Sequence, residues 1–455
     1  MSDLRPREQW NTKLGFILAA MGSAVGLGNI WRFSYVTGEN GGAAFLLIYL
    51  LCILLIGIPI IMAEFTIGKK AQSDVVGSFN KLAPGKPWVL AGILGVASAF
   101  IILSFYGVIA GWTVYYFTQY ITGGLASEPA GGYGDFFGAF ITSTFHPLFW
   151  QFLFMALTVS IVYLGVKRGI EKTNKILMPL LALLVIGLAA YSMTLGGAAE
   201  ALNFLFTPDW SALRDGNVYL AALGQAFFSL SLGMGALITY GGYLDRKHKL
   251  PGAALSVAGL DTAFAVAAGL MIFPAVFAFG IAPDSGPGLV FITLPGIFDS
   301  MAGGQIYGLL FFFLLAAAAL SSAVSLLEVA VAYFMRKFEW TRQKTSLLIG
   351  GIIFLLGVPS SLGMGPLSGV TFFGKDILDS MDFLASNIFL PLGGLIIALF
   401  IGWGWKKADA LSASDFGDTT LGNAWIFIMK FFAPVVIFII FLASTGLLDR
   451  IINLF

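Results

Sequence analysis

Long apolar segments alternate with short polar connections along the whole chain. At about 20 apolar residues per membrane crossing, this pattern predicts eleven transmembrane helices, at residues 12–35, 41–69, 88–122, 147–166, 169–195, 218–243, 254–282, 305–335, 343–358, 377–405 and 423–448. Only helices and closed barrels satisfy every backbone polar group inside a bilayer. We therefore expect an all-α polytopic membrane protein.

Glycine and polar residues interrupt the first and the sixth of these spans, at Gly22 to Arg32 and at Gly224 to Gly235. Glycine lowers helix stability by about 1 kcal/mol relative to alanine, and irregular backbone persists at membrane depth only where protein or a watery cavity surrounds it. The two spans hold corresponding places in two five-span halves, residues 12–195 and 218–405. Five is odd, so the halves have opposite topology, and the paired breaks predict a binding site at mid-membrane.

The placement of charge orients the chain, whereas its composition mainly excludes other classes of protein. With 58% hydrophobic residues and a mean hydropathy of +0.89, a soluble globule is excluded. The net charge of +1 indicates no nucleic-acid partner. If the N-terminus is cytoplasmic, the inner loops hold 20 of the 25 lysines and arginines. The positive-inside rule then predicts a cytoplasmic N-terminus and an extracellular C-terminus. We expect the protein to lie in the plasma membrane.

Polar residues within the predicted spans are candidates for function, because burying them is costly. Asp261 in the seventh span either packs against a polar group or is kept charged by a bound cation. Asn29 and Ser229 offer further oxygens, and oxygen ligands suit a hard cation. Ser321 and Ser322 in the eighth span either bond to their own helix or complete a second cation site with carbonyls of the broken first span.

Other polar residues are less decisive, and several kinds of chemistry are not supported. Tyr106 bonds either another helix or a ligand carboxylate, and Arg32 and Asp382 either pair across an outer vestibule or are solvated helix ends. The two histidines, His146 and His248, lie in loops and indicate no zinc or copper site. The glycine-rich segments match no nucleotide-binding pattern, and no nucleophile and base stand together. We expect that the protein is not an enzyme and that it binds no organic cofactor.

With these features the chain resembles the neurotransmitter:sodium symporter family, whose LeuT-type fold has two inverted five-helix repeats with spans 1 and 6 unwound. The resemblance rests on the two broken spans, the Asn40-Gly-Gly-Ala-Ala-Phe start of the second span, Glu64, the region of Trp112 and the Leu-Ser-Ser of the eighth span. It covers residues 7–382 and is strongest with bacterial eleven-span transporters of hydrophobic amino acids. It implies one membrane transport domain over residues 1–455, with residues 423–448 as an extra helix.

The resemblance also implies specific roles for residues of this chain. Substrate would be bound by Ala24, Leu27, Gly28, Ile102, Tyr106, Phe228, Ser229, Ser231, Met234, Ser322 and Leu326. A first sodium ion would be bound by Ala24, Asn29, Ser229 and Asp261. A second would be bound by Gly22, Val25, Ala318, Ser321 and Ser322. The outer gate would comprise Arg32 and Asp382, the inner gate Arg7, Trp10 and Tyr243, and the unwinding of the fifth helix would depend on Gly169 and Pro179.

Departures from the family pattern narrow the expected function. Gly26 stands where monoamine carriers have an aspartate, which favours a zwitterionic amino acid. Met234 replaces a phenylalanine, and its flexible thioether suits side chains of different size. Asp261 replaces an asparagine and brings its own negative charge. These features predict chloride-independent import of large aliphatic and aromatic L-amino acids by alternating access.

At the inner gate, Arg336 replaces the aspartate expected there, and Glu328 or Glu339 is the candidate substitute. The expected partners are two Na⁺ ions, an amino acid and membrane lipid, with a monomer as the functional unit. Two alternatives stay open at this point. One is an amino-acid sensor without net flux, and the other is a proton-coupled carrier on the same scaffold.

Overall fold

The computed structural model describes residues 8–125, 127–283, 286–372 and 374–448. The first five crossings are α1 (Lys13–Ala24) with η1 (Gly28–Arg32) and α2 (Phe33–Glu39), α3 (Ala43–Cys52) with η2 (Ile53–Gly57) and α4 (Ile58–Ala71), α6 (Val89–Thr122), α8 (Phe145–Tyr163), and η3 (Val166–Glu171) with α9 (Lys172–Ser192). Here η marks a π-helical or 3₁₀ turn.

The other six crossings follow in the same manner. They are α11 (Gly216–Ser229) with α12 (Ala236–Gly242), α13 (Pro251–Ala278), α15 (Gly304–Phe338), α16 (Arg342–Leu362), α17 (Ile377–Phe383) with η6 (Leu384–Phe389), α18 (Leu390–Leu399) and η7 (Phe400–Gly404), and α20 (Thr420–Phe427) with η8 (Ile428–Phe432) and α21 (Ala433–Ser444). The connections carry α5 (Val75–Leu82), α7 (Gly132–Thr142), α10 (Ala198–Phe206), η4 (Ala212–Arg214), η5 (Gly286–Leu289), α14 (Thr293–Ser300) and α19 (Lys407–Ala413).

Each predicted span has a helical counterpart whose ends lie within four residues of the prediction. In the described part of the chain, nine helices are long and apolar enough to cross a membrane unaided, and α1 with η1 and α2 forms a tenth crossing bent by 50°. The remaining crossing is α11 and α12, which residues 230–235 separate. The two interruptions therefore lie in the two spans where the sequence predicts them.

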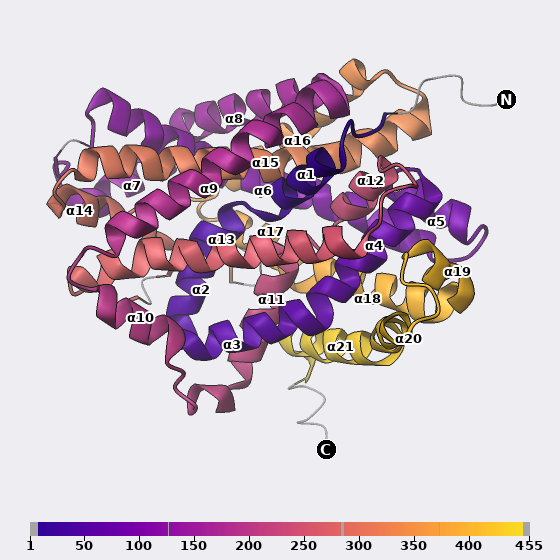
Figure 1. The fold of residues 1–455 in the computed structure, drawn as a ribbon. Helices are drawn as coiled ribbons and strands as arrows, with labels where there is room; N and C mark the ends of the chain where they lie inside the picture. Colours follow the sequence, from indigo (N-terminus) through magenta and orange to yellow (C-terminus); the bar gives the residue numbers. More distant parts are fainter. Residues whose placement is uncertain (1–7, 126, 284–285, 373, 449–455) are drawn as a thin grey trace.

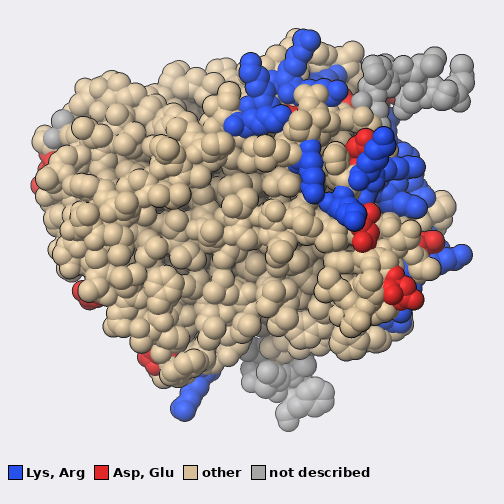
Figure 2. Space-filling view, viewed as in Figure 1, with Lys and Arg blue, Asp and Glu red and all other residues tan. Residues whose placement is uncertain are grey.

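Two ends of the molecule differ in charge. In Figure 1, α7, α10 and α14 lie at one end, and α5, α12 and α19 lie at the other. Figure 2 shows that most visible lysines and arginines gather at the end that carries α5 and α19, while the middle of the molecule is almost free of charge. Large apolar side chains such as Leu54, Leu183 and Phe438 are exposed around this middle. An apolar belt between polar ends is what a bilayer requires.

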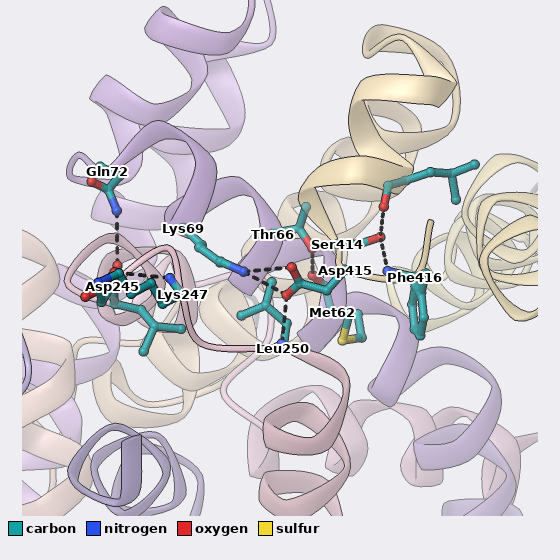
Figure 3. Close-up of polar contacts among 12 residues, drawn as sticks. Met62, Thr66, Lys69, Gln72, Asp245, Lys247, Leu250, Ser414, Asp415 and Phe416 are labelled. Carbon is teal, nitrogen blue, oxygen red and sulfur yellow. Dashed lines mark hydrogen bonds and ion pairs between the residues drawn. The ribbon is translucent and has the colours of Figure 1, made fainter. Parts of the chain in front are cut away.

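An ion pair between a buried lysine and a solvent-accessible aspartate joins three elements at the basic end (Figure 3). Asp415, in the loop after α19, accepts hydrogen bonds from Lys69 Nζ of α4 at 2.7 Å and from the Leu250 backbone amide at 3.0 Å. Lys69 is 5% exposed, so its charge is largely removed from water and depends on this carboxylate. The contact fixes the end of α4 beside the start of α13.

Candidate functional site

The break in the first span frees backbone groups at the centre of the molecule. Helix α1 ends at Ala24, and Val25 has an extended conformation (φ −72°, ψ 111°) before the chain resumes a helical path at Gly28. The Gly26 amide donates to Asn29 Oδ1 at 3.0 Å, and the Leu27 amide donates to the hydroxyl of Tyr106 at 3.2 Å. These contacts satisfy buried amides that a continuous helix would have bonded internally.

The break in the sixth span depends on glycine and on a buried glutamate. Gly233 has φ +77°, and a Cβ there would lie 2.5 Å from the Leu390 carbonyl oxygen, so only glycine fits. Its amide donates to Glu64 Oε1 at 2.8 Å. Glu64 is fully buried on α4 and thus holds the unwound segment in place. Ser231 also has positive φ (+56°), and its hydroxyl donates to the Ser23 carbonyl oxygen at 2.8 Å.

Three of the four residues predicted for the first sodium ion lie in direct contact. Asn29 Nδ2 lies 2.7 Å from Asp261 Oδ1 and 3.0 Å from Ser229 Oγ, and the Ser229 hydroxyl donates to Asp261 Oδ2 at 2.7 Å. Asp261 is fully buried. Ala24, the fourth residue, ends α1 beside this cluster and lines the adjacent cavity. Ser229 and Asp261 contribute oxygens, the ligand type that suits a hard cation, whereas Asn29 turns Nδ2 toward them. Asn29 Oδ1 accepts from the Gly26 amide and retains a second lone pair.

All five residues predicted for the second sodium ion also meet. Ser322 Oγ lies 3.3 Å from the Gly22 carbonyl oxygen and 3.2 Å from that of Val25. Ser321 Oγ lies 3.3 Å from the Val25 carbonyl oxygen and 2.8 Å from that of Ala318. Ser321 therefore bonds to its own helix and also contacts the broken span, whereas the binding of a cation by these oxygens stays a prediction.

A cavity of about 20 Å³, which is room for one water molecule, lies between the two broken spans, α6 and α15. All predicted substrate residues except Leu27 and Ser229 line it, together with Ser23 and Gly26. Ser23 was not among the predicted residues. Its hydroxyl donates to Ser325 Oγ at 2.8 Å. An amino acid can enter only if side chains such as Phe228 or Met234 move.

Tyr49 is a further residue that the sequence did not single out. Its hydroxyl lies 3.4 Å from Ser229 Oγ, on the side of the Asp261 cluster that faces α3. Tyr49 lies in an apolar run of the sequence, which does not indicate a functional role. The direction of its hydroxyl depends on how α3 packs against α11. Tyr49 and Ser229 thus provide hydroxyl groups around the carboxylate of Asp261.

At the outer end, the structure does not bring Arg32 and Asp382 into an ion pair. The Arg32 guanidinium lies over the ring of Phe228, 4.9 Å from its centroid, and Nη1 lies 3.3 Å from Gln225 Oε1. Asp382 instead accepts from the Ser386 hydroxyl at 2.9 Å. Arg32 therefore lies over the ring of Phe228, one of the residues predicted to bind substrate.

At the basic end, Glu328, one of the two candidate substitutes for the inner-gate aspartate, is paired with Tyr243 and Arg342. Its carboxylate accepts from Tyr243 at 2.5 Å and from two nitrogens of Arg342 at 2.6 and 2.8 Å. Arg342 also pairs with Glu8, whose pKa is raised because burial disfavours the charged form, although Arg342 opposes the shift. Sequence reasoning missed Arg342 and Glu8.

The remaining inner-gate residues are placed as follows. Trp10 Nε1 donates to the Tyr240 carbonyl oxygen at 2.9 Å, and the Trp10 amide donates to that of Tyr243 at 3.2 Å. Arg336 pairs with Asp74, which caps α5. Arg7 lies outside the residues that the structure describes.

The predicted hinge residues of the fifth span lie in a weakened helix. Gly169 lies within the π-helical turn η3, where a Cβ would meet the Ile161 carbonyl oxygen at 1.9 Å. Pro179 lies inside α9, where it removes one backbone hydrogen bond. The inner half of this span therefore combines a π-helical turn with a missing backbone hydrogen bond.

Comparisons with known proteins agree with these features. A family model described as the sodium:neurotransmitter symporter family matches residues 7–130 and 143–450. The crystal structure of MhsT in complex with L-phenylalanine is 67% identical, with a TM-score of 0.92, and the match covers 96% of this chain and 100% of that one. The uncharacterised sodium-dependent transporter YhdH of Bacillus subtilis is 41% identical over 99% of this chain and 100% of its own length. The sodium-dependent neutral amino acid transporter B(0)AT2 of Bos taurus is 30% identical over 60% of this chain and 41% of its own.

Proposed function

Since the chain belongs to the sodium:neurotransmitter symporter family, we propose that it imports large aliphatic and aromatic L-amino acids with two sodium ions and without chloride. Membership of the family and the likeness to MhsT confirm the predicted LeuT-type fold. They also confirm a sodium-dependent membrane symporter of a small molecule, which is not an enzyme. The amino-acid class, the number of ions and the independence from chloride are the parts that we propose.

The observation that carries the proposal is the cavity between the two broken spans. Tyr106 lines the cavity and its hydroxyl bonds the Leu27 amide, and both groups suit a carboxylate. Ile102, Met234 and Leu326 supply apolar surface to the same cavity. The cavity therefore suits a small molecule with a carboxylate at one end and an apolar side chain at the other.

Close packing around Gly26 supports a zwitterionic substrate over a monoamine. A Cβ at this position would lie 2.3 Å from Ser322 Oγ and 2.9 Å from the Tyr106 hydroxyl, so the local packing excludes an acidic side chain that could pair with an amine. MhsT was crystallised with L-phenylalanine, an amino acid of the class proposed.

The two oxygen clusters support two sodium ions with different surroundings. The first ion would neutralise Asp261 and lie beside the substrate carboxylate, so ion and substrate would each raise the affinity of the other by the same factor. The second would be held by neutral hydroxyl and carbonyl oxygens of Ser321, Ser322, Gly22 and Val25. Because Asp261 supplies a fixed negative charge, no chloride ion is needed to balance the first sodium ion.

The distribution of charge supports the orientation, with the N-terminus in the cytoplasm, the C-terminus outside and the basic end of Figure 2 facing inward. We take residues 1–455 as one transport domain in the cell membrane, surrounded by lipid and functional as a monomer. Weakening of the fifth span at Gly169 and Pro179 would let water reach the second sodium ion from this side.

Competition for uptake tests the proposed substrate class. In proteoliposomes with an inward sodium gradient, leucine, tryptophan and tyrosine are expected to reduce uptake of labelled L-phenylalanine, and replacement of chloride by gluconate to leave it unchanged. The apolar walls of the cavity make no hydrogen bonds that would select one of these side chains. Competition by glycine and alanine alone contradicts the substrate class, and loss of uptake in gluconate contradicts chloride independence.

A further inference from the structure

Asn174 is a buried amide with an unpartnered oxygen on the inner half of α9. The residue is fully buried, and its Nδ2 donates to the Ile170 carbonyl oxygen at 3.0 Å. Among the described residues, its Oδ1 has no hydrogen-bond partner. An unsatisfied buried acceptor costs about 1–3 kcal/mol, and buried polar groups in native proteins are nearly always paired. Such an oxygen therefore indicates a ligand.

This oxygen packs against Gly22, a residue whose carbonyl oxygen belongs to the second oxygen cluster. A Cβ added to Gly22 would lie 2.0 Å from Asn174 Oδ1, so the glycine makes room for the amide oxygen against α1. The carbonyl oxygen of the same glycine lies 3.3 Å from Ser322 Oγ. Asn174 therefore lies immediately beside a residue of the proposed second sodium site, although it does not belong to the predicted ligand set.

Toward the basic end, Glu171 continues the line of oxygens along α1. A Cβ on Gly15 would lie 2.2 Å from Glu171 Oε1, so this carboxylate also packs against a glycine of α1. Glu171 accepts from Lys175 Nζ at 2.6 Å and from the Asn11 amide at 2.7 Å. Glu171 ends the π-helical turn η3 and Asn174 follows on α9, so both residues lie between Gly169 and Pro179.

We propose that Asn174 Oδ1 is a transient binding site for a monovalent cation, occupied by the second sodium ion as it leaves Gly22 and Val25 for the cytoplasm. The inference rests on the proposed second sodium site. A cation in an apolar passage is strongly disfavoured, and an oxygen next to Gly22 lets the ion exchange one ligand for the next. This oxygen binds the sodium ion only during its release and not in the bound state. It therefore affects the rate of sodium release and leaves the equilibrium affinity for sodium unchanged.

Substitutions of Asn174 distinguish the effect of its side-chain oxygen from the effect of its size. Asn174→Leu removes the oxygen at similar size, and Asn174→Asp keeps an oxygen at the same position. Asn174→Ala removes it with less bulk, should the leucine variant fold poorly. Ser192→Ala is the matched control, because Ser192 is buried on the same helix at its opposite end.

The measurement is the rate at which bound ²²Na⁺ exchanges with unlabelled sodium in the purified protein with L-phenylalanine present. We expect about tenfold slower exchange in Asn174→Leu, which corresponds to about 1.4 kcal/mol in the barrier, and a rate at or above the wild type in Asn174→Asp. The sodium concentration for half-maximal phenylalanine binding should stay within twofold in all variants, and Ser192→Ala should change neither quantity.

Three results overturn the proposal. They are an unchanged rate in Asn174→Leu, equal slowing in Asn174→Leu and Asn174→Asp, and a shifted sodium dependence at equilibrium, which would make Asn174 a support of the bound state. Absence of sodium-dependent phenylalanine binding in the wild-type protein would contradict the proposed function instead, and it would be seen before any variant is compared.

Discussion

Replacing Asp261 with asparagine is expected to abolish sodium-driven uptake in chloride-free buffer and to leave part of it when chloride is present. The carboxylate is fully buried and accepts hydrogen bonds from Asn29 and Ser229 at 2.7 Å. Removing one partner of a buried charge pair costs about 3–5 kcal/mol, so the first sodium ion should bind more than 100-fold less tightly. Substrate affinity should fall with it, because ion and substrate are coupled.

Chloride should restore some activity because the hydroxyl groups around the lost charge remain. Tyr49 and Ser229 both lie at this cluster and can donate to an anion. Uptake of ²²Na⁺ and labelled L-phenylalanine by proteoliposomes in chloride and in gluconate measures the effect. Asp245→Asn, which changes an exposed carboxylate at the basic end, is the control. If the Asp261→Asn variant takes up substrate in gluconate at the wild-type rate, the negative charge of Asp261 does not balance a sodium ion.

Replacing Tyr106 with phenylalanine is expected to raise the KM for L-phenylalanine by about 10- to 150-fold, with a smaller change in the maximal rate. The Tyr106 hydroxyl lines the cavity and bonds the Leu27 amide at 3.2 Å, where the substrate carboxylate is proposed to lie. A hydrogen bond to a charged group is worth about 1.5–3 kcal/mol, which gives this range. Initial rates of uptake over a series of substrate concentrations provide both constants.

The control for this substitution is Tyr219→Phe, which removes an exposed hydroxyl that bonds the Leu213 carbonyl oxygen far from the cavity. It should leave both constants unchanged. A KM for Tyr106→Phe within twofold of the wild-type value would mean that the hydroxyl does not bind the carboxylate. A fall in the maximal rate alone would instead indicate a role in conformational change.

Much of the fold follows from the sequence because the physical constraints are strong. A bilayer requires helices of about 20 apolar residues, so the eleven spans are visible as composition. Glycine and polar residues at membrane depth have few stable arrangements, so the breaks near Gly26 and Gly233 are visible too. Asp261 and Ser322 stand out because polar side chains are costly in these spans.

The parts that sequence reasoning missed depend on contacts between distant segments. Arg342 meets Glu8 from 334 positions away, and both lie among other charged residues of the inner loops, where nothing distinguishes them. The expected Arg32–Asp382 pair is not formed, because the guanidinium lies over Phe228 instead. The free oxygen of Asn174 is likewise invisible in the sequence, since it depends on the close approach of α9 to Gly22.

Counterflow and net flux in proteoliposomes test the central claim most directly. We expect L-phenylalanine to accumulate against its gradient when sodium is higher outside, and ²²Na⁺ to enter only when phenylalanine is present. A proton gradient without sodium should drive no accumulation. Binding without flux would identify a sensor, and accumulation driven by protons alone would identify a proton-coupled carrier; either result would contradict sodium-coupled import of hydrophobic amino acids.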